Sequence, residues 1–242
     1  MENKAINIDN IYLGDCYDII QSIPDKSIDC IYTDIPYLFV TGGIGKSELG
    51  SRIKEEKKQL ENISKGIDLS IFNEFLRVLK KVNMFIWCSK LQILDILKFI
   101  EKNKFNFEIL VWCKTNPIPA TNNNFLPDIE YCIYIREKRV VLNSKYELKS
   151  KWFVSPINQY DKCFFKHPTI KPLQLVEKHI LHATKENDII LDPFLGSGTT
   201  AVAAFNEKRH YIGIEKEKEW YDIAQKRLNC ETAVGQQSMF LI

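Results

Sequence analysis

The last third of the chain shows the clearest alternation of helix-like and strand-like patterns. Apolar residues recur at helical spacing in 172–184, 196–207 and 218–228, and short apolar runs typical of buried strands occupy 188–192 and 210–215. Strands that alternate with helices in this way predict a mostly parallel sheet with helices on both faces.

The first part of the chain continues the same pattern. It predicts strands at 6–14, 28–33, 83–89, 105–114 and 129–137, and helices at 68–81 and 90–103. The last two strands flank the Pro- and Asn-rich segment 115–128, which predicts a hairpin. The acidic residues at the strand ends, above all Asp15, Asp34, Asp192 and Glu215, are the first candidates for a site, since ligands of α/β sheets bind at the carboxyl ends of the strands.

Two segments do not carry a core pattern. Residues 41–66 combine early glycines with many Lys, Arg and Glu, which predicts a mobile surface insertion whose charges are either solvated or in contact with a partner. The segment 137–165 interleaves basic and aromatic residues, a pattern that favours a nucleic-acid surface. Its residues of this kind are Arg139, Lys145, Lys149, Lys151, Trp152, Tyr160, Phe164 and Phe165.

Size and composition are those of an ordinary globular protein. The chain has 242 residues, 45% hydrophobic and 26% charged, and no apolar run approaches the roughly 20 residues that span a membrane. Its N-terminal segment lacks the pattern of a secretory signal. We therefore expect one cytoplasmic domain, residues 1–242, with no membrane association. A net charge of +2 is too small to indicate nucleic-acid binding by itself, because phosphate attraction depends on local clusters.

The cysteines and histidines do not predict a metal site. The seven cysteines occur singly, without a CxxC pair, and we expect them to be reduced. His179 and His182 share a predicted helix, but the sequence offers no third ligand beside them, so we interpret both as ordinary helix residues.

The first chemical motif is the loop DPFLGSGTT at 192–200. A strand ends in Asp192 and turns through Gly196 and Gly198 into a helix, a geometry that brings the backbone close to a ligand. The next strand ends in Glu215, a carboxylate placed to bind the ribose hydroxyls of a nucleoside-like cofactor. The loop lacks the GKT or GKS of a phosphate-binding P-loop.

The second motif is DIPY, residues 34–37, directly after a predicted strand. The exocyclic amine of a base is a poor nucleophile because its lone pair is delocalised into the ring. A carboxylate such as Asp34 can accept a hydrogen bond from that amine, and Tyr37 offers a flat face on which an extruded base can stack.

Together these motifs resemble those of the DNA amino-methyltransferases, which methylate adenine or cytosine at the exocyclic nitrogen. In that family the catalytic tetrapeptide is usually DPPY, SPPY or NPPY, and the cofactor loop is typically DPFxGSGTT. HPTIKP at 167–172 and GDC at 14–16 also resemble family motifs. The resemblance covers roughly 1–40 and 166–229, with weaker support from VNMFIWCS and LVWCKTNP between them.

The order of the motifs resembles the permuted arrangement of the beta class, because the catalytic tetrapeptide precedes the cofactor loop. The resemblance implies a Rossmann-like methyltransferase fold with seven strands, the last antiparallel, S-adenosyl-L-methionine as cofactor, and double-stranded DNA as partner. It also implies a target-recognition segment at about 115–165. A link to restriction-modification belongs to some members of the family, whereas the oligomeric state, including a homodimer, stays open.

The resemblance assigns catalysis to Asp34, Ile35, Pro36 and Tyr37. It assigns cofactor binding to Asp15, Cys16, His167, Lys171, Pro172, Asp192, Pro193, Phe194, Gly196, Ser197, Gly198, Thr199, Thr200 and Glu215. Within this set, Asp15 is expected at the cofactor's adenine, Glu215 at its ribose, and the 192–198 turn at its methionine side. Ile35 departs from the family, which usually has proline there. Isoleucine keeps the backbone carbonyl, so the change bears on the stiffness of the loop.

The implied reaction is direct transfer of a methyl group to a flipped base. A tetrapeptide that opens with aspartate favours adenine N6, with cytosine N4 as the alternative, because serine is commoner in the cytosine enzymes. Ring-carbon cytosine enzymes use a Pro-Cys nucleophile, and no cysteine here follows a proline. A catalytically inactive DNA- or nucleotide-binding module is a second alternative, since Ile35 is unusual.

The C-terminal tail suggests a separate interaction. Gln236, Met239 and Phe240 resemble the short peptides by which bacterial replication proteins dock on the sliding clamp. A tail strand or an extension of the last helix, packed on the body of the protein, is the favoured explanation of so short a match.

Overall fold

The computed structural model describes residues 6–38, 66–117, 125–157 and 170–239, with side chains as far as Cys230. His167, nearly all of the 41–66 insertion, and Tyr160, Phe164 and Phe165 lie outside these residues. The expectations for them therefore stay predictions.

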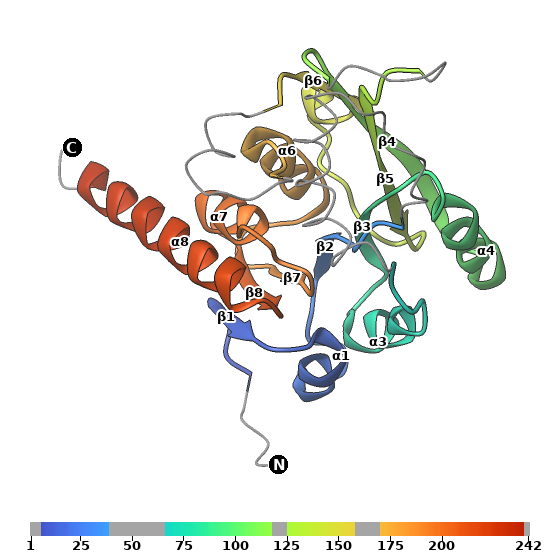
Figure 1. Cartoon of the computed structure of the whole chain (residues 1–242). Coiled ribbons are helices and arrows are strands. Elements are labelled where there is room, and N and C mark those ends of the chain that lie inside the picture. Colours follow the sequence, from blue (N-terminus) through green and yellow to red (C-terminus); the bar gives the residue numbers. More distant parts are fainter. Residues whose placement is uncertain (1–5, 39–65, 118–124, 158–169, 240–242) are drawn as a thin grey trace, which may run out of the picture.

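One mixed sheet of eight strands runs through the described part of the chain, in the order β1-β8-β7-β2-β3-β5-β4-β6 (Figure 1). The strands are β1 Asn10–Leu13, β2 Cys30–Asp34, β3 Asn83–Cys88, β4 Asn106–Lys114, β5 Ile129–Arg136, β6 Trp152–Ser155, β7 Ile189–Asp192 and β8 His210–Glu215. Only β5 is antiparallel to its neighbours, β3 and β4, among the described strand pairs. The predicted α/β fold and the β4–β5 hairpin are confirmed.

The sheet differs from the expected one in two respects. The eighth strand is β6, a four-residue edge strand in which exposed and half-buried positions alternate too briefly to be recognised from the sequence. The antiparallel strand is also the fifth along the chain, not the last. β5 lies between β3 and β4 in the sheet. It is the second strand of the hairpin with β4, so it runs antiparallel to β4 and also to β3.

Helices cover both faces of the sheet (Figure 1). They are α1 Cys16–Ile19, α3 Ile71–Val78, α4 Ile93–Asn103, α6 Leu173–Ala183, α7 Thr199–Asn206 and α8 Lys218–Met239, with short 3-10 turns at Ile20–Ser22 and Tyr146–Leu148. Neighbouring residues of a strand point to opposite faces. Accordingly, Ile31 of β2 packs in the cluster that includes α3 and α4, whereas Tyr32 packs in the cluster that includes α6 and α7.

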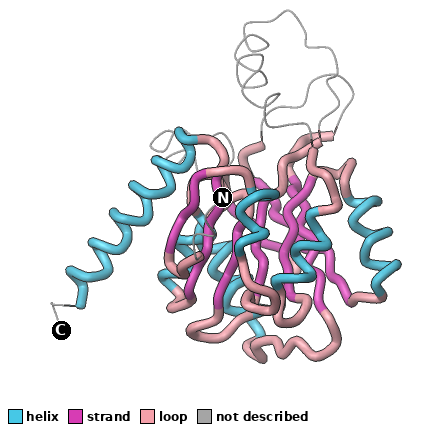
Figure 2. The backbone as a smooth tube through the Cα atoms, turned by 90° about the horizontal axis from the view of Figure 1, so that it is seen from below, coloured by secondary structure: helices cyan, strands magenta, loops and turns pink. Residues whose placement is uncertain are grey.

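Strand direction decides which loops can reach a common site. The parallel strands β1, β8, β7, β2 and β3 all end at one edge of the sheet, and antiparallel β5 begins there (Figure 2). Residues 137–150 follow the other end of β5. They lie at the opposite edge, where Asn143 donates a hydrogen bond to the carbonyl of His182 at the end of α6. The basic residues Arg139, Lys145 and Lys149 are therefore far from the strand-end edge.

Helix α8 is longer than its pattern predicts. The apolar positions end near Leu228, but the helix continues to Met239 and extends away from the sheet (Figures 1 and 2). Gln236 and Met239 thus lie on helical backbone, while Phe240 lies outside the described residues. Among the described helices, none has the length and apolarity needed to cross a membrane.

Asn83 at the start of β3 connects three elements through a buried amide. Its Nδ2 donates to the carbonyls of Asp29 (3.2 Å) and Ala183 (2.9 Å), and its Oδ1 accepts from the hydroxyl of Tyr134 (3.0 Å). Truncation leaves buried polar groups without partners, so we expect Asn83→Ala to lower the free energy of unfolding by about 2–3 kcal/mol. Urea denaturation measures this. Tyr134→Phe, which removes one of the bonds, should cost only about 1 kcal/mol, and equal losses in the two variants would contradict this account.

Candidate active site

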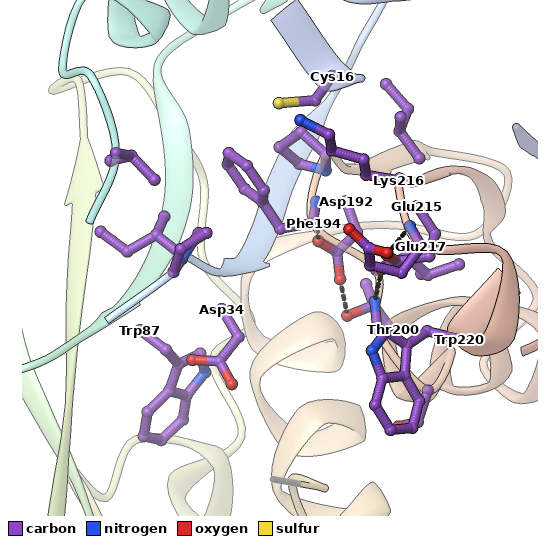
Figure 3. Close-up of a pocket in the computed structure, with 18 of the residues that line it drawn as sticks. Cys16, Asp34, Trp87, Asp192, Phe194, Thr200, Glu215, Lys216, Glu217 and Trp220 are labelled. Carbon is purple, nitrogen blue, oxygen red and sulfur yellow. Dashed lines mark hydrogen bonds between the residues drawn. The ribbon is translucent and has the colours of Figure 1, made fainter. Parts of the chain in front are cut away.

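A cavity of about 330 Å³ lies at the strand-end edge of the sheet. Its wall contains both chemical motifs, the tetrapeptide 34–37 and the loop that begins at Asp192. In Figure 3, Asp34 and Trp87 lie on one side of the cavity, and Asp192, Glu215 and Trp220 on the other. Two stretches separated by more than 150 residues of sequence therefore share one site, because β2 and β7 are adjacent parallel strands.

The glycine-rich loop is tied to its strand by Asp192, which ends β7. Its carboxylate accepts hydrogen bonds from the hydroxyl of Thr200 (2.6 Å) and from the backbone N–H of Phe194 (3.1 Å). Burial raises the pKa of Asp192 to about 7, although both hydrogen bonds favour the ionised form. The group can therefore change its charge near neutral pH when a cation approaches.

Glu215 ends β8 and faces the same loop. One carboxylate oxygen accepts from the N–H of Gly196 (2.7 Å) and the other from the N–H of Glu217 (2.8 Å). These bonds hold the carboxylate against the cavity wall, and each oxygen has a second lone pair for a ligand hydroxyl. Burial raises the pKa of Glu215.

The start of α7 is held by a buried arginine that the sequence did not single out. Arg227 of α8 donates a hydrogen bond to the hydroxyl of Thr199 (2.8 Å). Its guanidinium also lies 3.4 Å from the hydroxyl oxygen of Ser197. Gly198 precedes the helix with a positive φ of 84°, and a Cβ there would meet Ala224 at 3.0 Å. Glycine at 198 thus permits the close approach of α7 to α8 rather than contact with a ligand.

Backbone hydrogen bonds hold the tetrapeptide from its flanks. The N–H of Ile35 donates to the carbonyl of Trp87 on β3 (3.2 Å), a bond that proline could not make. The side chain of Ile35 is fully buried, and Gln92 donates to the carbonyl of Pro36 (2.9 Å). These contacts replace the stiffness that a first proline would supply.

The carboxylate of Asp34 has two oxygens in different environments. Oδ2 is paired with the buried ammonium of Lys171. Oδ1 is buried and has no hydrogen-bond partner among the described residues. Burial raises the pKa of Asp34, and the charge of Lys171 opposes that rise. An unpaired acceptor at the cavity wall is the group that an amine donor requires.

A sequence profile of the DNA methylase family matches residues 28–226. The chain belongs to this family. It is 34% identical to the type II methyltransferase M2.LlaDCHI of Lactococcus lactis subsp. cremoris, over 92% of this chain and 90% of the relative. It is also 34% identical to the type II methyltransferase M2.MboI of Moraxella bovis, over 93% and 89% of the two chains.

Solved structures of related proteins have the same architecture. The complex of M1.HpyAVI with SAM superimposes with a TM-score of 0.67 at 31% identity and covers 91% of this chain and 98% of its own. The cytosine-N4-specific PvuII DNA methyltransferase gives a TM-score of 0.66 at 18% identity, over 92% and 87% of the two chains, and that likeness concerns the fold alone. The expected DNA amino-methyltransferase is thus confirmed at the level of the family.

Most of the residues assigned from the methylase motifs meet at the cavity. Its wall includes Asp15, Cys16, Asp34, Ile35, Pro36, Tyr37, Lys171, Asp192, Pro193, Phe194, Gly196, Ser197, Thr199, Thr200 and Glu215. Pro172 and Gly198 are not part of the wall that the described residues form: Pro172 is buried at the start of α6. Lys171 was expected beside the cofactor, but its side chain contacts Asp34 and Tyr37 of the tetrapeptide.

Several wall residues of this DNA methylase were not predicted. Trp87 is one of them. Glu130 does not belong to the wall that the described residues form, but it contacts the wall residues Lys171 and Tyr37. A charged residue at the start of the apolar run IEYCIYI was a usable signal for it. The wall also contains Tyr17, Lys216, Glu217 and Trp220. Lys216 pairs with Asp15 (2.8 Å), whose other oxygen caps α1.

The described residues hold no cluster of three or more potential metal ligands. His179 lies in the core, where its ring stacks on Phe85 and its Nδ1 is 3.2 Å from the hydroxyl of Tyr32. Burial lowers its pKa to about 3, so this histidine is neutral at physiological pH.

Replacing Lys171 tests the buried charge pair of the methylase. In Lys171→Met, the carboxylates of Asp34 and Glu130 lose their shared cation, so we expect a loss of about 3–5 kcal/mol in unfolding free energy at pH 8. The loss should shrink toward pH 4, because Asp34 without its cation has a pKa raised further above that of the unfolded chain and is then protonated, whereas Glu130 keeps its pair with Lys114. Urea denaturation at both pH values measures it. The control Lys151→Met breaks an exposed pair with Glu108 and should cost under about 1 kcal/mol. A pH-independent loss in Lys171→Met would contradict the assignment.

Proposed function

We propose that this DNA methylase transfers the methyl group of S-adenosyl-L-methionine to the exocyclic N6 of adenine in double-stranded DNA. The observation that carries the proposal is the single cavity that joins the tetrapeptide to the glycine-rich loop. A methyl donor held at the loop and a base held at Asp34 would be neighbours, and positioning of this kind supplies much of the rate acceleration in group transfer.

The cofactor half of the cavity fits S-adenosylmethionine. Glu215 presents carboxylate oxygens for ribose hydroxyls, Asp192 offers a negative charge near a cationic methionine group, and Trp220 provides an aromatic surface. M1.HpyAVI, at 31% identity, was solved with SAM. When bound, the cofactor supplies the electrophilic methyl group, and the residues of this chain orient it.

The base half of the cavity fits an extruded nucleobase. Oδ1 of Asp34 accepts a hydrogen bond from the exocyclic amine, and the backbone carbonyl of Ile35 is available as a second acceptor. Tyr37 provides the stacking surface. Hydrogen bonds accepted from both amine N–H groups raise the electron density on the nitrogen and let it pyramidalise toward the methyl group. Methyl transfer leaves a neutral thioether on the cofactor and a positive charge on the nitrogen, which then releases one proton to Asp34 or to solvent. The reaction needs no covalent enzyme intermediate.

We assign adenine over cytosine from the sequence of the tetrapeptide, because the fold does not discriminate between the two bases. The cytosine-N4-specific PvuII enzyme has the same fold, so the first residue of the tetrapeptide, Asp34, carries the choice. Digestion of methylated DNA to nucleosides, followed by mass spectrometry, should show N6-methyladenine. N4-methylcytosine as the product would replace adenine by the alternative substrate and leave the family unchanged.

Asp34→Ala separates an active enzyme from an inactive binding module. We expect the variant to lose methyl transfer by about 100-fold or more, because it removes the acceptor of the amine hydrogen bond. The measurement is transfer of tritium from labelled cofactor to unmodified plasmid DNA. Asp95→Ala, which removes an exposed carboxylate on α4, serves as the control and should retain full activity. A wild type that transfers no more label than Asp34→Ala would support the inactive module.

Cofactor affinity should depend on pH through Asp192. Burial raises the pKa of this carboxyl to about 7, so it is mostly protonated at pH 6 and mostly ionised by pH 7.5. A cationic cofactor binds the ionised form, and the Kd should fall by about five- to tenfold over that interval. The stability of the free protein changes with pH in the opposite direction. Because burial raises the pKa of Asp192, protonation of this group stabilises the fold below pH 4, and this stabilisation is lost as the pH rises through 7. Isothermal titration calorimetry measures the Kd. Asp192→Asn should remove the pH dependence, and an unchanged slope would exclude Asp192 as its source.

Target recognition is best placed in the loops that leave the cavity edge. Residues 115–128 follow β4 and residues 156–170 follow β6, and both strands end at that edge. Within the expected segment 115–165, the strand β5 belongs to the sheet and 137–150 lies at the far edge. A homodimer and sliding-clamp docking through Gln236, Met239 and Phe240 stay predictions.

A further inference from the structure

Glu130 is a buried carboxylate beside the tetrapeptide, in a strand that the methylase motifs do not include. It is the second residue of β5, whose antiparallel direction brings its start to the edge where β2 and β3 end. Its side chain is 17% exposed and lies within hydrogen-bonding distance of three groups. These are Lys114 (2.6 Å), Lys171 (2.9 Å) and the hydroxyl of Tyr37 (3.4 Å).

The ammonium of Lys171 is fully occupied by this arrangement. A lysine ammonium has three donors. They face Oδ2 of Asp34, a carboxylate oxygen of Glu130, and the hydroxyl oxygen of Tyr37 at 3.3 Å. The hydroxyl of Tyr37 in turn donates to Glu130, which closes a ring of three groups. Each member fixes the orientation of the other two.

The charges of the cluster also balance. Asp34 and Glu130 supply two negative charges, and Lys114 and Lys171 supply two positive charges. Burial by itself would raise the pKa of Glu130, but the two lysines outweigh it and lower the pKa to about 2, so the group is ionised at all working pH values. Without Glu130, the two lysines would outnumber the remaining carboxylate, Asp34, and the cluster would carry a net positive charge. This charge would lie beside the base nitrogen, which itself becomes positive during methyl transfer.

We infer that Glu130 is a positioning residue for methyl transfer: it holds Lys171 and Tyr37 so that the acceptor carboxylate of Asp34 and the stacking ring face the base in one geometry. This inference rests on the proposed function. It assigns to β5 a part in the reaction, although Glu130 touches neither the methyl group nor the base amine in the proposed arrangement.

Glu130→Gln tests the role, because glutamine keeps the shape and removes the charge. We expect kcat for tritium transfer to plasmid DNA to fall by about 10- to 100-fold, the size of effect that misplaced reacting groups produce. The KM for DNA and the Kd for S-adenosylmethionine should stay within about threefold of the wild-type values. The carboxylates proposed to bind the cofactor, Asp192 and Glu215, lie on other strands, β7 and β8. The matched control is Glu108→Gln on the neighbouring strand, which breaks the exposed pair with Lys151 and should leave kcat unchanged.

A second variant keeps the test decisive if Glu130→Gln does not fold. Glu130→Asp retains the charge and shortens the side chain by one methylene, so kcat should fall by a smaller factor with normal cofactor binding. Combining Glu130→Gln with Tyr37→Phe should cost less than the product of the single effects, because the first change weakens the hydrogen bond that the second removes.

The outcomes separate this inference from the proposed function. A wild-type protein that transfers no label to DNA overturns the proposed function. An active wild type with Glu130→Gln or Glu130→Asp at wild-type kcat overturns the role of Glu130 alone. A rise in KM or Kd at unchanged kcat would also overturn it, because it would show a binding role.

Discussion

The ion pairs of Lys171 with Asp34 and Glu130 are the contacts on which the base half of the site depends. Lys171 precedes α6, Asp34 ends β2 and Glu130 begins β5, so three distant parts of the chain meet at one ammonium group. A buried charge without a partner is costly, and this lysine has a side-chain exposure of 6%. The geometry of the acceptor carboxylate is therefore coupled to correct packing of the sheet and of α6.

The topology of the sheet makes this meeting unavoidable. Parallel strands bring the acidic residues at their ends, Asp34, Asp192 and Glu215, to one edge, with β7 between the other two strands. The antiparallel strand contributes its first residues instead of its last, which brings Glu130 to the same edge. The tetrapeptide after β2 and the glycine-rich loop after β7 thus lie side by side, because their strands are adjacent and parallel.

The sequence allowed much of the fold and the two ends of the site to be predicted. Strong apolar periodicity identified β2, β3, β7, β8 and the main helices. The motifs DIPY and DPFLGSGTT, through their positions at strand ends and their resemblance to the methyltransferase motifs, predicted the two sides of the site. The prediction failed where local pattern carries no information. β6 has four residues, and α8 continues beyond its apolar positions. Glu130 was not singled out, because its neighbours in space depend on where the predicted hairpin lies in the sheet, beside β3, and sequence periodicity does not specify that position.

The isoleucine at 35 shows how a departure from a motif can be compatible with its geometry. Proline restricts φ and has no N–H, so it stiffens a loop from within. Isoleucine leaves φ free, but its N–H binds the carbonyl of Trp87 and its side chain fills the core beneath the loop. Gln92 holds the next carbonyl, that of Pro36. The backbone of the tetrapeptide is therefore restrained by contacts with β3 and with the turn before α4, where a proline ring would otherwise restrain it. Because the carbonyl of Ile35 is retained, the loop keeps the second acceptor of the proposed reaction.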